Sequence, residues 1–237
     1  MANTRHLKRH SMPLLWPVKR KNITFISRPN PGSYKREYVV SALILLRDVL
    51  KYAQTLKEAK YILHNEKVLV NGREVKETKF PIGLFDVIEI PTTNEKLTLL
   101  FDEFGKVKLV KSKDDLVYMK VTGKRNIRGG KHQLNFMNGF NLYVDSKVFS
   151  KVNVEDTVVY NFKSKKVEST IPLKEGSFVY IFDGKFKGRF VELQSIIKYN
   201  GITRDVVEVK EGKEVHSTAK DYCFAIGTKK EEVKRFN

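Results

Sequence analysis

The sequence predicts an α+β protein made of several small modules. Three observations predict this fold class: a basic start interrupted by prolines, a stretch with helix and hairpin signals, and a long second half of short apolar segments separated by turns. Strands do not alternate regularly with helices, so a doubly wound nucleotide-binding fold is not expected. At roughly 100–200 residues per domain, a chain of 237 residues has room for two or three such modules.

The net charge points to a polyanionic partner. Lys and Arg number 45 against 27 Asp and Glu, which gives a formal net charge of +18. An excess of this size attracts phosphate backbones, so a nucleic acid is the leading inference. The alternative is a basic surface that only keeps the protein in solution.

Cysteine usage and hydropathy suggest a cytoplasmic protein. Cys223 is the only cysteine, so neither an intramolecular disulfide nor a cysteine-based zinc site can form. Residues 1–10 lack the apolar segment of a secretion signal, and no run of about 18 apolar residues is present to span a membrane. A membrane partner is not expected, because the sequence shows no long amphipathic basic helix.

Residues 1–36 are expected to form a basic arm. Residues 1–40 carry nine Lys or Arg against one Glu, and four prolines exclude long helices. Because apolar residues are sparse, we expect the arm to become ordered on a partner, with Trp16 and Phe25 packing rather than stacking on bases. The candidate phosphate contacts of the arm are Arg5, His6, Lys8, Arg9, Lys19, Arg20 and Lys21.

A small helical module is expected over residues 37–91. The apolar stretch from Glu37 to Tyr52 contains neither Gly nor Pro and predicts a largely buried helix. Thr55 and Glu58 match a capping box, in which the Glu58 carboxylate reaches back to the backbone amide of Thr55. A second helix therefore begins after Thr55, and its apolar face comprises Leu56, Ala59, Ile62 and Leu63.

A tight hairpin follows the second helix. Asn71-Gly72 lies between short apolar runs, which is the strongest local signal for a type I′ turn. A further turn over Pro81–Gly83 precedes a strand that ends at Ile90, and Pro91 ends the module.

The second half predicts small β-barrels, because short strand-like segments recur between turns. A composition break near Ile171-Pro172 divides it into a central β-rich domain, 92–171, and a domain over 172–227, before a basic tail, 228–237. The expected strands are Leu97–Phe101, Lys106–Val110, Leu116–Val121, His132–Phe136, Asn141–Val144, Thr157–Asn161, Phe178–Phe182, Phe190–Ile196, Val206–Val209 and Tyr222–Ile226.

A glycine-containing loop over Thr122–Lys131 is a second candidate contact with RNA. Its glycines let the backbone approach a phosphate closely, but the spacing of a nucleotide-binding Gly-rich loop is missing. The alternative is a mobile surface turn. The cations of this loop are Lys124, Arg125, Arg128 and Lys131.

Residues 37–91 resemble the S-four RNA-binding domain in the order of their two helices, their Val-Leu-Val-Asn-Gly-Arg hairpin and the segment Phe80–Ile88. The resemblance implies a cationic surface on the second helix and the hairpin that recognises folded RNA by shape. Transferred to this sequence, that surface comprises Lys57, Lys60, Lys67, Asn71 and Arg73. The alternative for any single lysine is a solvated helix face.

Over nearly its whole length the chain resembles the small-subunit ribosomal protein S-four-e family in its archaeal form. The motifs are His6–Arg9, Leu15–Pro17, Arg28–Gly32, Phe80–Ile88 and Gly129–Asn135. The resemblance implies small-subunit rRNA and neighbouring ribosomal proteins as partners, no small-molecule substrate and no cofactor.

The stretch Glu175–Val191 resembles a KOW motif, which implies an SH3-like barrel at the C-terminus. In it, Gly188 takes the place of the motif's hallmark glycine, and Val191 stands where a second glycine is usual. The cations expected to point outward from the loop, towards RNA or a neighbouring protein, are Lys185, Lys187 and Arg189.

No catalytic or metal-binding residues are expected. The five histidines are scattered, no nucleophile motif occurs, and Cys223 lies in an apolar segment that predicts burial. Two other classes stay open: a KOW-containing transcription elongation factor and an RNA-modifying enzyme with an S-four-type module. The first would need a polymerase-binding domain and the second a separate catalytic domain, and no segment resembles either.

Overall fold

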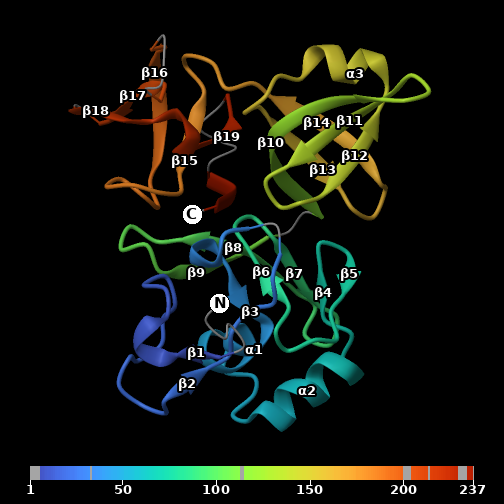
Figure 1. Ribbon diagram of the computed structural model, residues 1–237, viewed down its shortest axis with the longest axis vertical. Helices are drawn as coiled ribbons and strands as arrows, with labels where there is room; N and C mark the ends of the chain where they lie inside the picture. Colours follow the sequence, from blue (N-terminus) through green and yellow to red (C-terminus); the bar gives the residue numbers. More distant parts are fainter. Residues whose placement is uncertain are drawn as a thin grey trace. The chain divides into compact units, whose positions relative to one another are not determined.

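The computed structural model describes residues 6–32, 34–112, 115–199, 204–212, 214–228 and 234–236. In these ranges the protein is a mixed α and β structure with mostly strands and few helices, as predicted (Figure 1). The chain divides into two compact units. The first comprises Met1–Leu100 and Lys106–Asp115, and the second comprises Phe101–Gly105 and Leu116–Asn237.

The first unit is built around a five-stranded sheet with the strand order β5-β4-β7-β8-β9. Fully buried side chains such as Ile88 and Leu99 fill its core. Two short strand pairs, β1 with β2 and β3 with β6, join segments distant in sequence. The strands are β1 (Leu7–Lys8), β2 (Phe25–Ile26), β3 (Val40–Ser41), β4 (Leu69–Val70), β5 (Arg73–Glu74), β6 (Pro81–Ile82), β7 (Val87–Ile90), β8 (Glu95–Phe101) and β9 (Val107–Lys111).

The helix predicted from Glu37 begins later than expected. Val40 instead pairs with Ile82 in the β3–β6 ladder, and the Ser41 hydroxyl accepts a hydrogen bond from the Ile44 amide at 3.4 Å. A serine that satisfies an orphan amide in this way sets the start of a helix. The helical segment is α1 (Ala42–Ile44) with a π-helical turn, η3 (Leu45–Val49), preceded by a 3-10 turn, η2 (Arg36–Tyr38).

The second unit contains two five-stranded antiparallel sheets. The first has the order β12-β11-β10-β13-β14 and the second the order β18-β17-β16-β15-β19. The core between their strands includes the fully buried Val179, Ile181, Leu193 and Val207. The strands are β10 (Leu116–Ile127), β11 (Lys131–Phe136), β12 (Asn141–Val144), β13 (Thr157–Asn161), β14 (Lys166–Ile171), β15 (Phe178–Ile181), β16 (Phe190–Ile197), β17 (Val206–Glu211), β18 (Glu214–Ala219) and β19 (Cys223–Gly227).

Each strand predicted in the second half is present, with small shifts at its ends, except that the strand predicted over Leu116–Val121 is much longer. β10 continues from Leu116 to Ile127, so the predicted loop over Thr122–Lys131 is in fact the end of a β-hairpin. Among the described residues of this unit, the strands β14 and β18 and the helix α3 (Ser146–Lys151) were not predicted, and neither were the short 3-10 turns η4 (Lys220–Tyr222) and η5 (Lys234–Phe236). In the described part of the chain, no helix is long and apolar enough to cross a membrane.

Candidate nucleic-acid interface

The predicted second helix is α2 (Leu56–Asn65), and its cap forms almost as expected. The Thr55 hydroxyl accepts a hydrogen bond from the Glu58 amide at 3.2 Å. The Glu58 carboxylate reaches back one residue further than predicted and accepts from the Gln54 amide at 2.8 Å. This hydrogen bond is the main reason that the pKa of Glu58 is lowered. The cap therefore fixes where the helix starts and how its faces are oriented.

One face of α2 is cationic. Ala59 and Leu63 are buried, whereas Leu56 is 46% exposed, so the apolar face is narrower than predicted. The opposite side carries an exposed stripe at the helical spacing of three and four residues, which consists of Lys57, Lys60, Tyr61 and His64. The sequence analysis included the two lysines but not the 66% exposed Tyr61. An exposed aromatic between cations is the signal by which it could have been found.

The predicted hairpin is confirmed as the pair β4–β5. Asn71 and Gly72 both have positive φ, +51° and +72°, as a type I′ turn requires. Lys67 and Arg73 flank the hairpin with exposed side chains, and neither forms an ion pair with a described residue. Both cations are thus available to phosphate.

Asn71 has a structural role that the sequence did not reveal. Its side-chain amide donates to the Asp86 carboxylate at 2.7 Å, and its side-chain oxygen accepts from the Val87 amide at 2.9 Å. The other oxygen of Asp86 accepts from the Gly83 amide at 2.6 Å. Because Asn71 is committed to this network, its assignment as an RNA contact is not supported. Burial raises the pKa of Asp86 to about 6.

The arm folds back on itself through the β1–β2 pair, and several of its sparse apolar residues are nevertheless buried. Leu7, Met12, Leu15 and Ile26 are buried, and Trp16 is 2% exposed with its indole donating to the Val39 carbonyl at 2.8 Å. The packing predicted for Trp16 is therefore confirmed. The packing predicted for Phe25 is wrong, because this side chain is 52% exposed beside His6.

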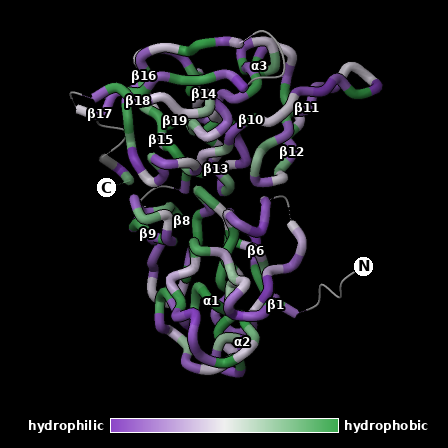
Figure 2. Tube along the Cα trace, turned by 60° about the vertical axis from the view of Figure 1, so that its left-hand side comes forward, coloured by the Kyte–Doolittle hydropathy of each residue, from purple (hydrophilic) through white to green (hydrophobic). Residues whose placement is uncertain are grey.

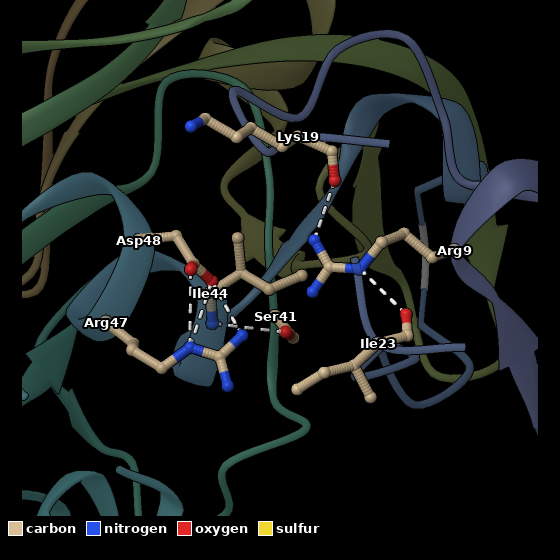
Figure 3. A network of polar contacts seen from close by, with 7 residues as sticks. All are labelled: Arg9, Lys19, Ile23, Ser41, Ile44, Arg47 and Asp48. Carbon is tan, nitrogen blue, oxygen red and sulfur yellow. Dashed lines mark hydrogen bonds and ion pairs between the residues drawn. The ribbon is translucent and has the colours of Figure 1, made fainter. Parts of the chain in front are cut away.

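The buried side chain of Arg9 connects two distant segments of the arm by hydrogen bonds. It is 6% exposed, and its guanidinium donates to the carbonyls of Ile23 at 3.1 Å and Lys19 at 2.7 Å (Figure 3). A guanidinium engaged in this way is not available to phosphate, so its prediction as an RNA contact is corrected to a structural role. The other predicted contact residues of the arm that the structure describes are exposed: His6, Lys8, Lys19, Arg20 and Lys21. Arg5 lies outside the described residues.

The predicted cations of the β10–β11 hairpin fall into two groups that differ in their contacts. Lys124 lies against the Phe149 ring at 4.4 Å and donates to the carbonyls of Phe149 and Val152, both at 2.5 Å, so it stabilises the end of α3. Its predicted contact with RNA is replaced by this intramolecular role. Arg125, Arg128 and Lys131 are exposed on the hairpin. Gly129 and Gly130 form the turn with φ of +86° and +70°.

The cations of the Glu175–Val191 stretch differ in availability. Lys185 is exposed, whereas Arg189 forms an ion pair with Glu211 that raises the pKa of the guanidinium. Lys187 is half-buried, with its aliphatic chain over Gly105. The outward orientation predicted for all three is therefore clear only for Lys185.

Gly188 makes room for a close backbone approach. It has φ of +82°, and a Cβ at this position would overlap the backbone carbonyl of Asp102. The neighbouring Phe101 exchanges two hydrogen bonds of 2.9 Å with the Tyr180 hydroxyl. The glycine was predicted to shape its loop, but its contact with this distant segment could not be read from the sequence.

Among the described residues, no three His, Cys, Asp or Glu side chains gather in a way that could hold a metal ion. Cys223 is fully buried, as predicted, and burial raises the pKa of its thiol to about 12. Lys120 is also buried, and its ammonium group donates to the carbonyls of Asp221 and Cys223. These hydrogen bonds give Lys120 a structural role.

Comparisons with known proteins identify a family to which this chain is similar. The family model described as "Ribosomal family S4e" matches residues 93–167. Small ribosomal subunit protein eS4 of Methanocaldococcus jannaschii is 35% identical over 237 residues, covering 97% of each chain. The protein of the same name from Nanoarchaeum equitans is 36% identical, covering 94% of this chain and 95% of its own.

A solved structure is similar as well. The crystal structure of the 30S ribosomal protein S4e from Thermoplasma acidophilum matches with a TM-score of 0.68 and 30% identity, covering 81% of this chain and 97% of its own. The relatives named here are archaeal, in agreement with the archaeal form that the sequence motifs implied. Identity above 30% over almost the whole length shows that this chain belongs to the ribosomal protein family S4e.

Proposed function

We propose that this protein is a structural constituent of the small ribosomal subunit, where it binds and stabilises folded rRNA and thereby supports translation. One observation carries the proposal: the end-to-end relationship at 35% identity to a protein named small ribosomal subunit protein eS4. The net charge of +18 fits a partner with a phosphate backbone. Its place is then the cytoplasm, and its partners are small-subunit rRNA and the neighbouring ribosomal proteins.

We propose two of the predicted surfaces as binding surfaces, because each has cations that are exposed and have no ion-pair partner among the described residues. On the first unit they are Lys57, Lys60, Lys67 and Arg73, and on the β10–β11 hairpin they are Arg125, Arg128 and Lys131. Each cation that neutralises a phosphate releases counterions, so the affinity falls as salt rises. The role is architectural, and no catalysed reaction is proposed.

The proposed modules are an arm (1–36), an S-four-type module (37–91), a central β-domain (92–171), a KOW-type barrel (172–227) and a tail (228–237). The antiparallel order β18-β17-β16-β15-β19 and the close backbone contact at Gly188 support the barrel. In the tail, Phe236 is buried and lies edge-on to Tyr118, which supports a docked end.

Sedimentation of cell extract on sucrose gradients at moderate and high salt tests the function. We expect the protein to migrate with the small subunit at both salt concentrations. Migration with RNA polymerase would favour the transcription-factor alternative, and migration as free protein would contradict a structural ribosomal role.

A triple variant tests the surface on the first unit. Replacing Lys57, Lys60 and Arg73 with Ala should weaken rRNA binding and flatten its dependence on salt by up to roughly 0.7–0.9 log units per lost contact. Alanine at Lys108, Lys166 and Lys174, exposed lysines outside the proposed surfaces, removes the same charge as a control. Equal slopes for the two triple variants would show that the proposed surface is wrong.

A further inference from the structure

The strands β10, β11 and β12 align their side chains in rows across one face of the sheet. In the pairing register, Arg125 lies opposite Gln133, and Gln133 lies opposite Tyr143. Next to this row, Gly123 lies opposite Asn135, and Asn135 lies opposite Asn141. Directly paired residues of an antiparallel sheet project to the same side, as do residues two apart on one strand. Lys131, two residues before Gln133, joins the same face.

Two contacts confirm this assignment of faces. The Gln133 side-chain amide donates to the Asn135 side-chain oxygen at 2.6 Å, which requires both to project to one side. The Asn135 side-chain nitrogen lies 3.7 Å from the position of a Cβ on Gly123, in the neighbouring strand. We call the surface of Arg125, Lys131, Gln133, Asn135, Asn141 and Tyr143 the open sheet face.

The opposite side of the same strands is already covered. His132 stacks on Phe149 of α3 with ring centroids 4.5 Å apart, and its two ring nitrogens lie 2.9 Å from Asn126 and Ser146. Leu134 is fully buried there. Because α3 covers that side, the open sheet face is left to solvent.

The exposed side chains of the open sheet face have one consistent chemistry. Tyr143 is 66% exposed, and Arg125, Lys131 and Asn141 are exposed around it. Leu116–Val144 contains five Lys or Arg and neither Asp nor Glu. In Figure 2 the β10–β11 hairpin, coloured mostly as hydrophilic, extends outward from its sheet. A surface without carboxylates but with an aromatic ring, three amides and two cations is complementary to a polyanion.

We propose that the open sheet face binds unpaired nucleotides of RNA, with Tyr143 as a stacking platform for a base. This inference rests on the proposed rRNA-binding function and adds the class of RNA that this face takes. A base that is stacked inside a duplex does not offer its ring to a protein side chain, whereas an unpaired base offers both its ring and its edges. The amides of Gln133, Asn135 and Asn141 can donate and accept hydrogen bonds at those edges.

Arg125 and Lys131 then hold the phosphates that flank the bound base. This division of roles makes a specific claim: loss of the Tyr143 ring reduces affinity for single strands without changing the number of phosphate contacts. Loss of the two cations instead reduces the salt slope. A surface that only attracted phosphate would not distinguish single-stranded from paired RNA in this way.

The test uses the full chain, with a short single-stranded RNA of mixed sequence and a fully paired RNA duplex as probes. Tyr143→Ala should weaken binding of the single strand by about tenfold, with unchanged salt slope and unchanged affinity for the duplex. Tyr143→Phe keeps the ring and should bind as the wild type does. Phe104→Ala is the matched control, because Phe104 is an 84% exposed aromatic outside the open sheet face and the stripe on α2; it should leave the ratio of the two affinities unchanged.

Thermal unfolding of each variant checks that the fold is intact. An unaltered ratio of single-strand to duplex affinity in Tyr143→Ala would overturn the inference. So would a variant that binds RNA normally but fails to join the small subunit, because the face would then contact a neighbouring protein. In either case the proposed function stands if the wild type migrates with the small subunit, so the two proposals fail separately.

Discussion

At the scale of single residues, the carboxyl group of Asp86 makes the stability of the fold depend on pH. Its folded-state pKa of about 6 lies above the value of 3.8 for an exposed Asp, because burial disfavours the charge. Between about pH 4 and pH 6 the folded state therefore retains a proton that the unfolded state has released. The free energy of unfolding should fall as pH rises through this window, by on the order of 3 kcal/mol at most.

Replacement of Asp86 by Asn should remove that pH dependence. The variant is also expected to lose about 1–3 kcal/mol near neutral pH, because one of the donors from Asn71 and Gly83 then faces an amide nitrogen. Denaturant unfolding on either side of pH 6 measures both effects. Glu175→Gln, at an exposed carboxylate, serves as the control. If Asp86→Asn retained the slope of the wild type, the buried carboxyl would not be its source.

Gly188 allows a prediction that separates backbone strain from a steric clash. Gly188→Ala places a Cβ on the Asp102 carbonyl at a φ of +82°, whereas Gly176→Ala has nearly the same φ, +80°, and no atom within 4 Å of its Cβ. Both variants carry a backbone penalty of roughly 1–2 kcal/mol, and only Gly188→Ala should lose about 1–3 kcal/mol more. Equal free energies of unfolding for the two variants would refute the close contact.

At the scale of elements, the cap of α2 is expected to stabilise the helix that carries the cationic stripe. Thr55→Ala removes the acceptor for the Glu58 amide and should lower the free energy of unfolding by about 1 kcal/mol. Thr55→Ser keeps a hydroxyl and should retain most of the stability. Denaturant unfolding compares the two, and equal losses would mean that the hydroxyl does not act as a cap.

Elements with a local signal could be predicted, and elements set by distant partners could not. The capping box of α2 and the Asn71-Gly72 turn depend on neighbours within a few residues, so both were found. The start of α1 depends on the pairing of Val40 with Ile82, which no local pattern reveals. Similarly, polar β14 and β18 are edge strands that form because β13 and β17 offer free edges.

The same distinction holds for the candidate site. Charge alone selected the candidate cations, and most of those with described side chains are exposed. It could not show that Arg9 and Lys124 donate to backbone carbonyls or that Arg189 is paired with Glu211. Those contacts depend on the tertiary structure. The row of Arg125, Gln133 and Tyr143 depends on strand register, which the reading of Thr122–Lys131 as a loop concealed.

At the scale of the whole molecule, the excess of positive charge is divided among separate surfaces, which under the proposed function bind one polyanion. The stripe on α2 belongs to the first unit, and the open sheet face belongs to the second. Counterion release is counted per phosphate contact, so the salt slope reports the sum of contacts made by all surfaces. Affinity on such a scaffold is distributed, and no single lysine is expected to be essential.

This distribution predicts additive effects on binding to small-subunit rRNA. The triple variant of Lys57, Lys60 and Arg73 and the double variant of Arg125 and Lys131, all to Ala, share no partner among the described residues. When combined, their changes in binding free energy should add to within about 0.3–0.5 kcal/mol, and their losses of salt slope should add as well. Filter binding across a salt series measures both quantities. A combined variant no weaker than the triple variant would mean that the two surfaces do not engage the same RNA at the same time.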